Sequence, residues 1–342
     1  MTTSRQRMID ALTCNRPDKI PVVYHPSPAG LHVHGQKLLD LFNQYPPDNP
    51  ITFDRIPHPR PETIDAHGNY HEVRTDEWGT TWEWRIFGLC GHPKGFPLAD
   101  LDAAEQYVFP APPAIGCAGF LADRAQVELE QQNYFVIRGG ASIFEKLQAL
   151  RPMDELMVDL ITGDRRLLRV LDRLVDYMRQ VIAYQLAIGA DGVFFGDDWG
   201  GQTAPLISPK LFREVFKPRY RELMAPIQRA GRAVCFHSCG FLGEIFDDLL
   251  DLGINVFWPQ ILRYDEDELL RKCRAHQVAL YLHPDRQHLI PRGTPAEIDA
   301  RIAAYADRFH GLGGGGIFYV EIENDAPFEN VRALIEAVQR YR

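Results

Sequence analysis

A histidine and a cysteine stand two positions apart at the end of a predicted strand. The run reads VCFHSCG, with the imidazole at His237, the thiol at Cys239 and Gly240 directly after them. Residues i and i+2 of an extended chain project to the same side. Zinc binds imidazole nitrogen and thiolate sulfur. We therefore interpret the pair as half of a metal site, and the alternative is a core histidine beside a buried thiol.

A third ligand has to come from another strand. No cysteine follows the last predicted strand, so the best donor is Glu321, or Glu323 two positions further on. Asp197, Asp198 and His283 are weaker candidates. Three protein ligands would leave one position of zinc open. The metal would then act as a Lewis acid for group transfer, by holding a thiol as thiolate or by polarising an ether oxygen, and carbonyl hydration is also compatible.

Short apolar runs alternate with helical patterns along the chain. The candidate strands are Ile20–Tyr24, Ile51–Ile56, Tyr134–Arg138, Gly192–Phe195, Ala233–His237, Ile254–Trp258, Val278–Leu282 and Gly316–Val320, of which the second has the weakest signal. Apolar strands alternating with amphipathic helices predict a parallel sheet covered by helices. Eight such units predict an α/β fold of the single-domain (β/α)8 TIM barrel type, and the alternative is an open doubly wound sheet.

Helix starts support this alternation. Ser208-Pro209 and Thr294-Pro295 each place a capping hydroxyl before a proline at the first helical position. Apolar residues then recur at helical spacing, as they do from Leu242 to Leu250 and from Val331 to Val338.

Polar side chains gather at the ends of these strands, where active sites of such barrels lie. We expect Asp197, Asp198 and His283 to be catalytic, and substrate to contact the side chains of His25, Arg138, Trp199, Gln202 and Gln260. Adjacent carboxylates on an extended chain point to opposite sides, so at most one of the two aspartates faces the barrel mouth. The alternative for this pair is a loop cap that binds backbone N–H groups.

Two segments fall outside the pattern. Residues 57–133 are rich in Pro, Gly, Trp and His, and the alternation of Thr80, Trp82 and Trp84 predicts a hairpin, laid as an insertion across the barrel mouth. The run Gly313–Gly316 looks like a phosphate loop but precedes the last strand. It would lie at the bottom face of the barrel, so we interpret it as a tight turn.

Composition excludes several classes of protein. The chain has 342 residues, a net charge of -9 and a pI near 5.7, which argues against a nucleic-acid partner. No stretch reaches the roughly 20 apolar residues of a membrane span, and the N-terminus lacks the features of a signal peptide. The six cysteines form no CxxC pair, which favours reduced thiols in a cytoplasmic protein. The oligomeric state stays open.

Several ordered motifs extend over nearly the whole chain. They are RMIDALTCNRPDKIPV, TDEWGTTWE, GADGVFFGDDWGGQ, SPKLFREVFKPRYRELM, FHSCG followed by LLDLGINVFWPQ, and DAPFENVRALIEAV. Together they resemble the uroporphyrinogen decarboxylase superfamily, and more closely its cobalamin (corrinoid) methyltransferases. FHSCG is the most diagnostic of these motifs. True decarboxylases carry an arginine-rich segment of the form MRQAGR after the first strand, whereas this chain reads YHPSPAGLHVHG.

The resemblance implies a zinc-dependent methyltransferase that exchanges a methyl group between a small methylated substrate, or a thiol or folate acceptor, and a separate cobalamin protein. In that family zinc is held by the HxC pair and a late cysteine. Here the corresponding stretch reads YVEIENDAPFENV, so either Glu321 replaces that cysteine or the zinc is lost. The alternatives are a metal-free decarboxylase-type lyase and a non-catalytic protein that binds a tetrapyrrole or corrinoid.

Overall fold

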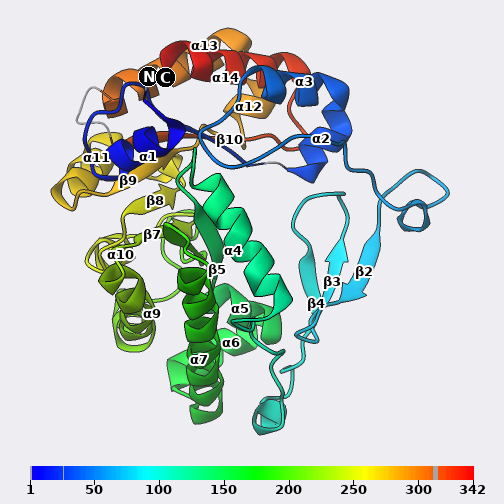
Figure 1. Ribbon diagram of the computed structural model, residues 1–342. Coiled ribbons are helices and arrows are strands. Elements are labelled where there is room, and N and C mark those ends of the chain that lie inside the picture. Colours follow the sequence, from blue (N-terminus) through cyan, green and yellow to red (C-terminus); the bar gives the residue numbers. More distant parts are fainter. Residues whose placement is uncertain (1, 26, 311–314) are drawn as a thin grey trace.

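A parallel β-sheet with helices around it organises the chain. The computed structural model describes residues 2–25, 27–310 and 315–342 (Figure 1). The strands of the sheet are β1 (Val22–His25), β5 (Ile137–Ala141), β6 (Gly192–Gly196), β7 (Ala233–Ser238), β8 (Val256–Pro259), β9 (Ala279–Leu282) and β10 (Gly316–Glu321). Their order is β1-β10-β9-β8-β7-β6-β5, and all neighbours run parallel. The predicted α/β class and parallel sheet are thus confirmed.

The prediction of a strand at residues 51–56 is wrong. In the described part of the chain the sheet has 7 strands, and β1 and β5 are its two edges. The free edge of β1 is already occupied by side chains. Asp48 accepts a hydrogen bond from the Val22 N–H (2.9 Å), and the Asn49 amide bonds both the N–H and the carbonyl of Tyr24 (3.0 Å each). Because these groups take the ladder positions and Pro50 follows, the next segment has no edge to join.

The sheet curls around a concave inner face. The rings of Trp258 on β8 and Tyr319 on β10 lie with centroids 4.1 Å apart, although β9 separates their strands. In a flat sheet such strands would stand about 9.6 Å apart. Met8 and Leu12 of α1 (Ser4–Leu12) pack with Tyr319 in this inner cluster. The fold is therefore a curled parallel sheet of the TIM-barrel kind, with two edges among the described residues.

Residues on the strands alternate between this inner face and the helices outside. On β7, Val234 and Phe236 belong to the large core beneath the helices, whereas Cys235 belongs to the inner cluster. His237 therefore shares the inner face with Cys235. This alternation places the predicted metal-binding pair on the concave side of the sheet.

The helices follow the strands in the predicted alternation. In chain order they are α1, α2 (Pro28–His34), α3 (Gln36–Gln44), α4 (Ala118–Glu130), α5 (Phe144–Leu150), α6 (Met153–Thr162), α7 (Arg165–Ala187), α8 (Pro209–Leu211), α9 (Lys217–Arg229), α10 (Ile245–Leu250), α11 (Glu266–Ala275), α12 (Leu289–Arg292), α13 (Pro295–Tyr305) and α14 (Phe328–Tyr341). Over the described ranges, none of them combines the length and the apolar character that a bilayer span requires.

Both predicted helix starts are confirmed. Ser208 accepts a hydrogen bond from the Leu211 N–H, and a π-helical turn, Phe212–Phe216, then joins α8 to α9. Thr294 and Glu297 form a full capping box at the start of α13.

The segment between β1 and β5 forms a sheet of its own. Strands β2 (Glu72–Thr75), β3 (Thr81–Trp84) and β4 (His92–Gly95) pair antiparallel in sequence order, separate from the parallel sheet in Figure 1. The predicted hairpin is therefore present as β2–β3, and β4 extends it. Of the glycine run, residues 313 and 314 lie outside the described residues, and Gly316 begins β10.

Candidate metal-binding active site

Three side chains that can bind a metal converge where β6 and β7 end. The ligand atoms of Asp198, His237 and Cys239 all lie within 4.8 Å of one another. The Cys239 Sγ is 3.3 Å from His237 Nε2, and Asp198 Oδ1 is 3.5 Å from the same nitrogen. Asp198 also accepts a hydrogen bond from the Cys239 N–H at 2.7 Å. One oxygen, one nitrogen and one sulfur donor form a set that zinc accepts.

The histidine is oriented for this role. Its Nδ1 lies 2.9 Å from the carbonyl oxygen of Trp258, which can only accept, so Nδ1 carries the proton. Nε2 is then left with a lone pair that faces Cys239 and Asp198. Metal-binding histidines use the same arrangement, in which a backbone carbonyl fixes the tautomer. Burial lowers the pKa of His237, which keeps the ring neutral.

The third member of the group is Asp198, whereas Glu321 was the preferred expectation. Sheet order explains the difference. β6 is the direct neighbour of β7, with Gly196 in register with His237, so the residues after β6 lie beside those after β7. β10 is separated from β7 by β9 and β8. Among the described residues, neither Glu321 nor Glu323 belongs to the group of close ligand atoms.

Asp197 has different surroundings from its neighbour Asp198. Its carboxylate is fully buried and accepts hydrogen bonds from the hydroxyls of Ser142 and Tyr220 and from three backbone N–H groups, those of Ile143, Phe144 and Glu145. It therefore caps the start of α5. Burial raises the pKa of Asp197, and these donors act against that shift. The expected divergence of the two carboxylates is observed, since Asp197 is fully buried whereas the Asp198 side chain is 38% exposed.

Two glycines bring the loops after β6 and β7 together. Gly240 has a φ of 77°, and a Cβ on it would come within 2.2 Å of the Gly200 carbonyl oxygen. A Cβ on Gly200 would likewise come within 2.4 Å of the Cys239 carbonyl oxygen. Only glycine permits this approach, which holds the Cys239 backbone beside the residues that follow Asp198.

Replacement of Gly240 by alanine should therefore harm both folding and metal binding. We expect Gly240→Ala to lower the free energy of unfolding by about 2–3 kcal/mol, because the cost of a positive φ and the cost of a backbone clash both contribute. Gly231→Ala is the matched control, since Gly231 also has a positive φ (65°) but open space around its Cβ position. It should cost only about 1 kcal/mol. Urea unfolding of both variants measures the difference, and equal losses would contradict the close-approach explanation.

A second polar cluster surrounds Glu321 at the end of β10. Its carboxylate oxygens lie 3.7 Å from His25 Nε2, 3.9 Å from His283 Nε2 and 3.8 Å from the Arg286 guanidinium. Arg286 lies closer to Glu323, at 2.5 Å. The structure thus brings His25, His283 and Glu321 together, and none of them belongs to the group of three close ligand atoms.

His283 is held neutral and in one tautomer. The indole N–H of Trp258 donates to its Nδ1 at 3.3 Å, so the proton of the neutral ring sits on Nε2. Burial, the Arg286 charge and two nearby histidines lower the pKa of His283 to about 3. With its Nε2 protonated, His283 presents an N–H rather than a lone pair toward Glu321, 3.9 Å away, and so is not set up as a metal ligand.

Of the other residues that were predicted to contact substrate, three contact other parts of the protein and one is exposed. Trp199 is fully buried and stacks on Phe144 at 4.0 Å, so it belongs to the core. Arg138 faces outward and pairs with Glu130 of α4. Gln260 accepts a hydrogen bond from the Gly240 N–H at 3.1 Å and so steadies the loop that carries Cys239. Gln202 is exposed on the loop after β6.

Glu145 is a functional candidate that the sequence did not indicate. It lies in the first turn of α5, which follows β5. Partial burial, followed by the charges of Asp198 and Asp197, raises the pKa of Glu145 to about 8. The prediction considered polar residues directly at the ends of predicted strands, whereas Glu145 lies further along the chain, beyond Ala141 at the end of β5.

This raised pKa predicts how the stability of the metal-free protein depends on pH. In the folded state Glu145 keeps its proton up to about pH 8, whereas the unfolded chain loses it near 4.5. The folded state therefore loses stability as pH rises through that window. Glu145→Gln removes this effect. Between the two ends of the pH window, the free energy of unfolding of the variant should therefore rise by about 1 kcal/mol relative to that of the wild type, after allowance for solvent screening. Urea titrations across the window test this, and a constant difference would contradict it.

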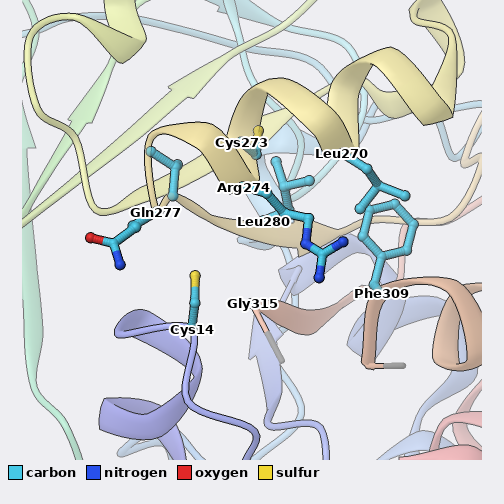
Figure 2. Close-up of a pocket in the computed structure, with 9 residues that line it drawn as sticks. Cys14, Leu270, Cys273, Arg274, Gln277, Leu280, Phe309 and Gly315 are labelled. Atoms are coloured by element: carbon cyan, nitrogen blue, oxygen red, sulfur yellow. The ribbon is translucent and has the colours of Figure 1, made fainter. Parts of the chain in front are cut away.

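A separate hollow lies at the other end of the strands. Its lining includes Val278 and Gly315, which precede β9 and β10, together with Cys273 and Arg274 of α11. Figure 2 shows Cys14 reaching toward α11 across this space. Because the hollow opens near the strand starts, it is distinct from the candidate site at the strand ends.

Comparisons with known proteins agree with this architecture. The chain is 25% identical over 214 residues to a uroporphyrinogen decarboxylase from Psychromonas ingrahamii, an alignment that includes 60% of this chain and 54% of the relative. The chain therefore spans about half the length of that curated relative. A methyltransferase from Methanosarcina mazei shares the fold, with a TM-score of 0.61 and 17% identity over 100% of this chain and 99% of that one. The sequence profile named "Uroporphyrinogen decarboxylase (URO-D)" matches residues 147–341, so the chain belongs to the URO-D family.

Proposed function

We propose that this protein is a zinc-dependent methyltransferase that works with a corrinoid protein. The observation that carries the proposal is the convergence of Asp198, His237 and Cys239, with the imidazole tautomer set for metal binding. The shared fold with a methyltransferase supports the same reaction class. Asp198 takes the place that the sequence assigned to Glu321.

The chain's own residues would each have a defined task in this reaction. Asp198, His237 and Cys239 would hold the zinc, which would supply Lewis acidity by lowering the pKa of a thiol or by polarising an ether oxygen. Gln260 and Gly240 hold the Cys239 loop in place. Without a metal, burial and the Asp198 charge raise the pKa of Cys239 to about 12, so zinc binding must displace its proton.

We also propose that the segment around residues 57–133 closes the mouth of the site. The loop between β3 and β4 packs on α2, since a Cβ on Gly88 would come within 2.3 Å of the Ala29 nitrogen. Burial and the charges of Glu145 and Glu321 raise the pKa of Cys90 in this loop. Electrostatic effects of this kind fade over roughly 10 Å. Cys90 therefore lies near the strand ends, where such a cover would exclude water.

Methyl transfer from methylcobalamin to a thiol tests the proposal. In that reaction the cobalt–carbon bond breaks with its electron pair left on cobalt, a sulfur–carbon bond forms, and the thiol proton leaves to water. Anoxic protein with equimolar zinc should convert methylcobalamin, followed by its absorbance, in the presence of a suitable thiol. Protein stripped of metal should lose this activity and regain it with zinc. Full activity without metal would refute the proposal.

A decarboxylase-type lyase is the second candidate, because the curated relative is a uroporphyrinogen decarboxylase. The acidic strand ends weigh against it. Glu145, Asp198, Glu321 and Glu323 gather there, and a substrate with many carboxylates needs cations. Turnover of uroporphyrinogen by metal-free protein would favour this candidate.

A further inference from the structure

A short segment at the end of β8 supports the two metal-binding residues of β7. The carbonyl oxygen of Trp258 lies 2.9 Å from Nδ1 of His237 and fixes its tautomer. Two residues further on, the Gln260 side chain accepts a hydrogen bond from the N–H of Gly240, which directly follows Cys239. The imidazole and the loop that carries the thiol are therefore held from the same part of the chain.

The hydroxyl of Tyr264 extends this support along the loop. It donates a hydrogen bond to the carbonyl oxygen of Gly240 and accepts one from the N–H of Leu242, each at 3.1 Å. One hydroxyl thus bridges the two peptide groups on either side of Phe241, and the Tyr264 ring packs on the Phe241 ring at 5.6 Å. A 3-10 turn, η4 (Ile261–Arg263), immediately precedes Tyr264 and fixes its place relative to β8.

The peptide groups that this hydroxyl bonds are buried. Leu242 is fully buried, and Gly240 is buried in a turn with a φ of 77°. A buried peptide group that loses its partner carries a desolvation cost, which the loop can relieve only by moving. Tyr264 therefore helps to keep the loop in its observed conformation.

The conformation of this loop sets the position of the thiol. A single torsion, χ1, separates the backbone of Cys239 from its Sγ, so the backbone limits the sulfur to a few positions. Zinc requires that sulfur at about 2.3 Å. A shift of the loop would move Sγ away from the point where it meets His237 Nε2 (3.3 Å) and Asp198.

We infer that Tyr264 is a positioning residue for Cys239 and acts through the backbone of Gly240 and Leu242. The inference rests on the proposed function, because it takes Cys239 as a zinc ligand. Tyr264 supplies no ligand atom to the group of three. Its hydroxyl holds the loop where the sulfur faces the imidazole, and partners that orient metal ligands in this way contribute about 10–100-fold to metal affinity.

Tyr264→Phe tests the inference, because this variant keeps the ring and its packing and lacks only the hydroxyl. Zinc affinity, measured by competition with a chelator, should fall about tenfold. Cobalt(II) can replace zinc as a spectroscopic probe. At saturating cobalt the thiolate-to-cobalt charge-transfer band, which reports the sulfur–metal bond, should be weaker in Tyr264→Phe than in the wild type.

Tyr305→Phe is the matched control. Tyr305 is fully buried on α13, and its hydroxyl accepts a hydrogen bond from the Arg301 guanidinium at 3.2 Å. Loss of this hydroxyl should lower the free energy of unfolding by about 1 kcal/mol. Because Tyr305 does not contact the Cys239 loop, zinc affinity and the cobalt band should stay as in the wild type.

The outcomes separate this inference from the proposed function. Unchanged zinc affinity and an unchanged cobalt band in Tyr264→Phe would overturn the inference and leave the proposed function standing. An equal loss of zinc affinity in Tyr305→Phe would overturn it as well, since the effect would then follow stability alone. A wild-type protein that binds neither zinc nor cobalt would contradict the proposed function itself.

Discussion

His237→Ala protein is expected to lose the equimolar zinc that the wild type should carry. His237 presents Nε2 to both Asp198 and Cys239 through a tautomer set by the Trp258 carbonyl. Removal of a group that merely supports a ligand costs about 10–100-fold in metal affinity. Loss of the ligand itself should therefore cost more than about 100-fold, and Cys239→Ser should behave similarly. Competition with a zinc chelator measures the affinity.

Two further variants test which carboxylate is the third zinc ligand. Asp198→Asn should also weaken zinc binding, because Asp198 is the carboxylate within the group. Glu321→Gln should leave it unchanged, since Glu321 lies outside that group among the described residues. If Glu321→Gln lost the metal and Asp198→Asn kept it, the assignment of the third ligand would have to revert to Glu321.

Asp197→Ala is expected to destabilise the protein by about 3–5 kcal/mol. The carboxylate is fully buried and accepts bonds from two hydroxyls and three backbone N–H groups at the start of α5. Its removal leaves these donors buried without partners, and such groups carry a large desolvation cost. Urea unfolding of the metal-free variant gives the loss directly.

The neighbouring residue provides the contrast. Asp198 is 38% exposed, so Asp198→Ala should change the unfolding free energy of metal-free protein by about 1 kcal/mol or less. The two adjacent aspartates should therefore separate cleanly, one by its effect on stability and the other by its effect on metal affinity. Similar stability losses in both variants would contradict this division.

Much of the site could be predicted from local sequence. The strand that ends in FHSC placed His237 and Cys239 on one face, because side chains alternate along a strand. The same alternation separated Asp197 from Asp198. The capping signals at Ser208 and Thr294 marked helix starts correctly, since a side-chain oxygen and a proline act within one turn.

The prediction of an eighth strand failed for a non-local reason. The segment 51–56 has suitable residues, but the side chains of Asp48 and Asn49 already occupy the edge of β1. A strand forms only where a partner edge is open to it. Similarly, the hairpin of β2 and β3 was predicted from alternation, whereas its third strand depended on pairing with a segment of weaker pattern.

The sequence by itself determined which side of the sheet His237 and Cys239 face, because side chains alternate along an extended chain. It placed some strand ends less well, since the strand predicted at 134–138 is β5 at Ile137–Ala141. Only the tertiary structure decided which of the side chains at the strand ends come within metal-binding distance of one another. The neighbouring positions of β6 and β7 bring Asp198 to His237 and Cys239, whereas the distance of β10 from β7 leaves Glu321 with His25, His283 and Arg286. Distances between side chains on different strands depend on the curvature of the sheet and on packing between segments far apart in the chain, so no local pattern contains them.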